Sequence, residues 1–215
     1  MAQLDRRALI GGVLTAAVQP WQALAAPAPN LRFNILRNGK PFGQYTVASV
    51  VSGDAVTVTS DVTMKMRVSG LTVFDYMLHC VETWRGGRFM ELKSNSRRDN
   101  QNNAVSVKRG DAGAITANNT SGLVALPANA SPLSHWNPAA FDGPLFNPQD
   151  GYPLRLTAQS MGREGLTLAN GTKIGAVHWA LRGESQIDDW YDDAGVWAGL
   201  RAVFPDKSIV EYRRL

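Results

Sequence analysis

The sequence predicts an all-β protein built on a single antiparallel curved sheet, a β-roll or half-barrel. Three observations predict this fold class: apolar and polar residues alternate with period two along most of the chain, turn residues recur between the alternating segments, and helical spacing is nearly absent. Because the connections are short, neighbouring strands are expected to run antiparallel.

The first 25 residues carry the three parts of an export signal. Arg6 and Arg7 form a charged start, residues 8–18 are apolar, and Ala-Leu-Ala at 23–25 is typical of a cleavage site. The arginine pair before a weakly apolar run resembles a twin-arginine signal, which predicts a periplasmic protein. The apolar run has about 11 residues, whereas a spanning helix needs roughly 20, so the mature chain is expected to be soluble, without an integral membrane span.

Residues 26–215 are expected to form one domain. The net charge of +4 falls to +3 once Asp5, Arg6 and Arg7 leave with the signal, and the basic side chains are scattered, so we expect no nucleic-acid partner. Cys80 is the only cysteine, which excludes an intramolecular disulfide. The sequence predicts no cofactor.

The clearest strand covers residues 56–68, where Val56, Val58, Val62, Met64, Met66 and Val68 share one face and threonines and charged residues share the other. Turn residues such as those at 38–39, 52–54, 69–70 and 86–87 separate the segments. The other predicted strands are 32–36, 44–51, 72–84, 89–97, 104–108, 152–160, 166–168, 173–181, 186–191, 197–204 and 208–213.

Residues 118–151 interrupt this rhythm. The segment is rich in Asn, Ala, Pro and Ser, and it is too long and varied for an ordinary connection. We expect an irregular excursion, with a short helical turn at 131–136, that divides a first meander of strands from a second within one domain.

The strand at 72–84 is apolar on both faces, with Phe74, Tyr76, Leu78 and Cys80 on one side and Val73, Met77 and Val81 on the other. If one face lies on the core, the other is expected to be covered by the excursion or to line a cavity. The simpler alternative is that this second face is covered by other parts of the chain as ordinary core packing. The residues predicted to line a ligand groove are Phe74, Tyr76, Leu78, Met64, Met66 and Trp136.

The sequence identifies no catalytic residue and no metal site. His79 and Asp75 lie about 13 Å apart along one strand, too far for a hydrogen bond, and Cys80 faces away from His79. Ser134 and His135 lack the Gly-x-Ser-x-Gly context of a nucleophile elbow. The acidic run at 188–193 matches no calcium loop and is interpreted as a solvated hairpin end.

Several segments carry a resemblance to a known family. They are DWYDDAGVWAGL at 189–200, PDKS at 205–208, FNILRNGKPFG at 33–43, SHWN at 134–137 and NPQDG at 147–151. In these the chain resembles an uncharacterised, exported, β-rich family of proteobacteria with a domain of unknown function. More distantly it is similar to periplasmic β-rolls and to half-barrel carriers of lipoproteins, a resemblance that implies a fold and transfers no ligand residue.

Three functions remain open from the sequence. The first is a periplasmic binding or carrier module that holds a lipid or acyl chain in a concave sheet. The second is an envelope interaction or assembly protein without a small ligand, for which an open edge strand would be diagnostic. The third is a hydrolase of unknown class, which would require His79, Asp75, His135 or the 188–193 run to converge from separate strands.

Overall fold

A computed structural model describes residues 30–215 of the chain. The predicted export signal at 1–25 and its cleavage site lie outside the described residues. No helix in the part that is described has the length and apolar character needed to cross a bilayer.

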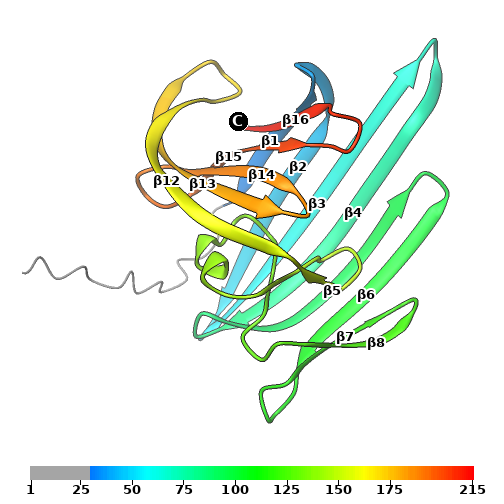
Figure 1. Cartoon of the computed structure of the whole chain (residues 1–215), viewed down its shortest axis with the longest axis vertical. Helices are drawn as coiled ribbons and strands as arrows, with labels where there is room; N and C mark the ends of the chain where they lie inside the picture. The colour runs from blue at the N-terminus through cyan, green and yellow to red at the C-terminus, as the bar shows by residue number, and fades with distance from the viewer. Residues whose placement is uncertain (1–29) are drawn as a thin grey trace, which may run out of the picture.

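The all-β prediction is confirmed, because the described chain forms one large antiparallel sheet of 13 strands (Figure 1). Its strands are β1 Leu31–Arg37, β2 Lys40–Ser52, β3 Ala55–Val68, β4 Leu71–Arg85, β5 Arg88–Arg98, β6 Gln101–Arg109, β7 Ile115–Asn119, β8 Gly122–Leu126, β12 Leu156–Thr167, β13 Lys173–Gly183, β14 Gln186–Tyr191, β15 Trp197–Val203 and β16 Ile209–Arg214. Their order in the sheet is β12-β13-β14-β15-β16-β1-β2-β3-β4-β5-β6-β7-β8.

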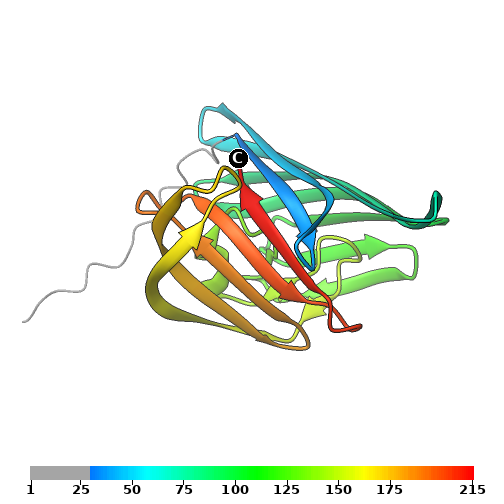
Figure 2. The ribbon, with the colours of Figure 1, turned by 90° about the horizontal axis from the view of Figure 1, so that it is seen from above.

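The two meanders are joined through β16 and β1, with Phe33 opposite Arg214 and Arg37 opposite Val210. This pairing makes the sheet continuous. Figure 2 shows that the sheet curls around an interior, and β8 and β12, its two edge strands, do not pair with each other. The fold is therefore an open, barrel-like sheet with a concave inner face.

Alternation determines which side chains face inward. Along β3, Val56, Val58, Val62 and Met64 are buried, as the period-two pattern predicts. Val68 differs, since it was expected on the dry face and is 55% exposed. It lies at the tip of the β3–β4 hairpin, which extends past the rest of the sheet (Figure 1).

Residues 127–155, which we call the plug, connect one edge strand of the sheet to the other. They contain β9 Ser131–Pro132, η1 Pro138–Asp142, β10 Leu145–Phe146 and β11 Pro153–Leu154, with β9, β10 and β11 forming a small second sheet. The irregular segment starts later than predicted, because residues 115–126 form β7 and β8. The expected helical turn at 131–136 was also misplaced, since the 3₁₀ turn begins at Pro138, next to the capping side chain of Asn137.

The plug packs its aromatic side chains on the concave face. Trp136 meets Trp84 edge-on at 5.6 Å between ring centroids, and Phe146 meets Phe89 at 5.4 Å. All four of these side chains are buried. The plug thus fills one end of the curled sheet and leaves the rest of the concave face to form the site described next.

Candidate functional site

A cavity of about 720 Å³ lies on the concave face between the sheet and the plug. Its size is within the range of pockets that hold small molecules, roughly 300–1,000 Å³. Most of its wall is apolar; these lining residues are Val62, Met64, Met66, Val73, Phe74, Leu78, Leu133, Leu154, Leu156, Ile187, Leu200, Ala202, Val203 and Phe204.

The cavity floor is formed by the inward side chains of β3 and β4. Five of the six residues predicted to line a groove lie on it, namely Met64, Met66, Phe74, Tyr76 and Leu78. They converge because the antiparallel register sets Met66 opposite Phe74, Met64 opposite Tyr76, and Val62 opposite Leu78. Whether they contact a ligand stays a prediction.

Trp136, the sixth predicted residue, does not line the cavity. It is 6% exposed and lies against Trp84, and its indole Nε1 donates a hydrogen bond of 3.3 Å to Glu82. Its place is in the packing at the closed end of the cavity. Sequence spacing could not show this, because the plug reaches the sheet only through tertiary packing.

The outward face of β4 is not covered by the plug. On this face Met77 is 46% exposed, whereas the inward Cys80, Glu82 and Trp84 are buried. The double-sided apolar pattern of this strand therefore arises from one face that is dry or lines the cavity and one that meets solvent.

Glu82 is a functional candidate that the sequence analysis missed. It lies on the inward face of β4 and is 1% exposed, and its Oε2 accepts hydrogen bonds from Nε1 of Trp84 at 2.9 Å and of Trp136 at 3.3 Å. Its Oε1 is buried without a hydrogen-bond partner. Burial raises the pKa of this carboxyl group to about 7, against the opposing effects of the two indole hydrogen bonds, the nearby Ser134 hydroxyl and the charge of His135. The sequence did carry a signal: Glu82 falls in the same alternation as Phe74, Tyr76, Leu78 and Cys80, which places it on the inward face of the strand.

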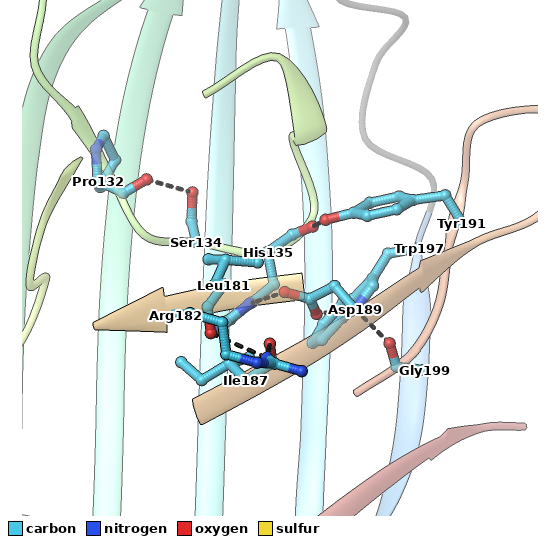
Figure 3. A network of polar contacts seen from close by, with 10 residues as sticks. All are labelled: Pro132, Ser134, His135, Leu181, Arg182, Ile187, Asp189, Tyr191, Trp197 and Gly199. Atoms are coloured by element: carbon cyan, nitrogen blue, oxygen red, sulfur yellow. Dashed lines mark hydrogen bonds and ion pairs between the residues drawn. The ribbon is translucent and has the colours of Figure 1, made fainter. Parts of the chain in front are cut away.

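A polar network anchors the plug beside the cavity (Figure 3). Nδ1 of His135 donates to Asp189 at 2.8 Å, and Nε1 of Trp197 donates to the other oxygen of the same carboxyl group at 2.9 Å. The His135 ring stacks on Trp197, and the hydroxyl of Tyr191 donates to the His135 carbonyl oxygen. His135 has a φ of 58°, an uncommon backbone conformation for a residue other than glycine that these contacts hold in place.

The solvated-hairpin interpretation of the acidic run was wrong for its first two carboxylates. Asp189 is fully buried in the network above. Asp188 is mostly buried and accepts hydrogen bonds from His178 and Arg182; burial tends to raise its pKa, but these two partners hold it below its usual value. The last two carboxylates do lie at a hairpin end: Asp192 accepts hydrogen bonds from the turn N–H groups of Ala194 and Val196, and Asp193 is exposed and pairs with Arg163.

The remaining candidates for acid–base chemistry lie apart from the cavity. His79 is on the outward face with Asp61 at 2.7 Å, and Asp75 pairs with Lys65 and Arg97. These pairs do not meet His135 or Asp189. Among residues 30–215, no group of three or more His, Cys, Asp or Glu side chains could hold a metal ion.

Two possible nucleophiles line the closed part of the cavity, and neither is activated. Burial raises the pKa of the Cys80 thiol far above its usual value, which keeps it protonated. The hydroxyl of Ser134 donates to the carbonyl of Pro132 at 3.4 Å, and Nδ1 of its neighbour His135 is engaged by Asp189. The arrangement is suited to holding a molecule by contact and hydrogen bonding.

Two arginines lie at the other end of the cavity. Arg37 pairs with Asp206 and Ser208, and Arg98 lies over the ring of Phe74 at 5.7 Å. The cavity therefore runs along β3 and β4 from a closed end at Glu82 to a charged end at Arg98.

A family model described as a domain of unknown function, DUF6134, matches residues 33–215. The chain belongs to the DUF6134 family. This supports the predicted membership of an uncharacterised β-rich family, while a proteobacterial origin and export stay predictions. No curated protein matches this DUF6134 chain.

The DUF6134 fold has a structural neighbour among solved structures. A crystal structure of a β-barrel-like protein of the domain of unknown function DUF1849 from Brucella abortus superposes with a TM-score of 0.61. The match covers 86% of this chain and 94% of that one, at 7% sequence identity. At this identity the likeness shows the fold alone.

Proposed function

We propose that this DUF6134 protein is a periplasmic, non-enzymatic binding or carrier module for an apolar ligand, a lipid or an acyl chain. The observation that carries the proposal is the cavity of about 720 Å³ on the concave face, which lies between the sheet and the plug. A long apolar wall of this kind would otherwise hold water against methionine, leucine and phenylalanine side chains.

The magnitude of apolar burial fits such a ligand. Each buried methylene contributes roughly 0.8 kcal/mol, so a chain of about 12 carbons would contribute about 10 kcal/mol before the costs of association. Subtracting an association cost of about 4 kcal/mol leaves about 6 kcal/mol, so a dissociation constant of some tens of micromolar is expected.

The nature of the wall also supports an apolar chain of variable shape. Met64 and Met66 lie on the floor, and their unbranched side chains adapt to irregular ligands. Phe74 and Phe204 add rigid aromatic surface at the charged end.

The test is native mass spectrometry of the mature protein purified after export, followed by the same measurement under denaturing conditions. A stoichiometric apolar molecule that dissociates on denaturation supports the carrier function and identifies the ligand class. A clean ligand-free mass, with no uptake of added lipid, contradicts it.

Matched variants assign the bound molecule to the cavity. Phe74→Asp places a charge on the cavity floor and should abolish retention of the ligand without unfolding the protein. Met77→Asp places the same charge on the outward face of the same strand and should retain it. Loss of the folded state in Phe74→Asp would instead assign Phe74 to the core.

A second candidate, an envelope assembly protein, is favoured by the open edge of the sheet. β12 has no strand beyond it among residues 30–215, and its Met161 is 56% exposed. Such an edge can accept a strand from another chain. If assembly is the function, Met161→Lys should dissociate a native complex that Phe74→Asp leaves intact.

A further inference from the structure

The closed end of the cavity contains a polar group whose hydrogen bonding is incomplete. Two indole N–H groups donate to Oε2 of Glu82, while Oε1 is buried without a partner. A buried carboxyl oxygen left without a hydrogen bond destabilises the folded protein. The Ser134 hydroxyl lies near this carboxyl group and lowers its pKa, but its hydrogen bond is made to the Pro132 carbonyl oxygen. The cavity also lies beside Glu82, so a molecule in the cavity can supply the hydrogen bond that Oε1 lacks.

The two indoles also determine where the proton of neutral Glu82 lies. Because Oε2 already accepts from Trp84 and Trp136, the proton resides on Oε1, which then acts as a donor. Burial keeps the pKa near 7, so this donor exists at mildly acidic and neutral pH. The titratable side chains nearest to it are Tyr45, Cys80 and His135, and the raised pKa values of Tyr45 and Cys80 keep those two uncharged.

The shape of the cavity restricts what can bring an acceptor to this donor. Its lining along β4 extends from Glu82 through Cys80, Leu78 and Tyr76 to Phe74, a length of about 26 Å at 3.3 Å per residue. A lining of this length accommodates an extended chain such as a single acyl group.

Resting on the proposed carrier function, we propose that Glu82 donates a hydrogen bond to the carbonyl oxygen of a single-chain acyl ligand, which lies in the cavity with its polar head at the closed end. The apolar tail then lies along Leu78, Met64 and Phe74 toward Arg98. The shared chemistry is an acyl carbonyl, which a free fatty acid or an ester of one can supply.

The test uses the mature protein and displacement of the apolar fluorophore N-phenyl-1-naphthylamine at about pH 6. Methyl dodecanoate, dodecanoic acid and dodecane have the same chain and differ in the head. The ester or the acid should bind about tenfold more tightly than dodecane, the gain expected from one hydrogen bond that satisfies a buried group. Whichever of the two binds tightly identifies the source of the carbonyl.

Two variants make the result specific to Glu82. Glu82→Leu should bind all three compounds alike. Glu82→Gln keeps an oxygen for both indoles and an N–H donor toward the cavity, so it should prefer the ester at about pH 6 and about pH 8, whereas the wild type should lose this preference at about pH 8. The second comparison holds even if Glu82→Leu does not fold.

The outcomes separate this inference from the proposed function. If the fluorophore and dodecane bind but the ester and the acid gain nothing, or if the wild type keeps its preference at about pH 8, the role of Glu82 is overturned and the carrier function stands. If none of the compounds binds, the carrier function fails, and this inference fails with it.

Discussion

Replacing Glu82 by Gln should change the pH dependence of stability by a predictable amount. The pKa of Glu82 rises from 4.5 to about 7 on folding because the side chain is buried. The folded state therefore binds more protons than the unfolded state between these values, and the free energy of unfolding falls as the pH rises through this window. A difference of about two and a half in pKa corresponds to about 3 kcal/mol, lost between about pH 4.5 and pH 7.

Glu82→Gln is neutral at every pH and keeps an acceptor for Trp84 and Trp136, so it lacks this loss. Relative to the wild type, the variant should gain about 3 kcal/mol in stability on going from about pH 4.5 to about pH 8. Urea unfolding of the ligand-free proteins, followed by tryptophan fluorescence, measures the difference. All other titrations cancel, because they are common to both proteins.

Glu184 provides the control for this measurement. It is exposed, so Glu184→Gln should show little change in the same comparison. Parallel pH profiles of the wild type and Glu82→Gln would refute the reasoning, since they would mean that Glu82 ionises in the folded protein as it does in water.

Three further predictions concern the network, a close contact and export. Asp189→Asn should cost about 3 kcal/mol in urea unfolding, since it disrupts a fully buried carboxyl group that accepts hydrogen bonds from His135 and an indole, and an unchanged midpoint would contradict this. Gly43→Ala would place a Cβ 1.9 Å from a backbone carbonyl oxygen of β3, so it should lower the melting temperature, and wild-type melting would contradict the register. Replacing both Arg6 and Arg7 by Lys should leave the precursor in the cytoplasm if the signal is of the twin-arginine type, and normal export would refute that type.

The sheet could be predicted from the sequence because its strands obey a local rule. Alternation along 56–68 depends on one buried and one exposed face, and residues two apart report on the same face. The positions of Met64 and Phe74 on one wall followed once β3 and β4 were paired. The pattern fails only at Val68, where the hairpin extends beyond the neighbours that would cover it.

The plug and its contacts could not be predicted in this way. Trp136 was expected at the ligand because it is a large aromatic residue in an apolar context, but tertiary packing places it behind Glu82. The acidic run was more informative than its composition indicated. On β14, Asp189 shares one face with the apolar Ile187 and the aromatic Tyr191, because residues two apart point to the same side of a strand. This is the pattern of an inward face, and Asp189 is buried there.

Glu82 breaks the same pattern on β4, and local inconsistencies of this kind concentrate at functional sites. A glutamine would satisfy both indoles at every pH, so the carboxyl group costs stability that the packing alone does not require. The gain in stability that a ligand causes must then agree with its measured affinity. A ligand that meets Oε1 should raise the free energy of unfolding according to its concentration and dissociation constant, and at about pH 6 methyl dodecanoate should stabilise the wild type more than it stabilises Glu82→Leu. Equal stabilisation of the two proteins would show that the ligand does not reach the closed end.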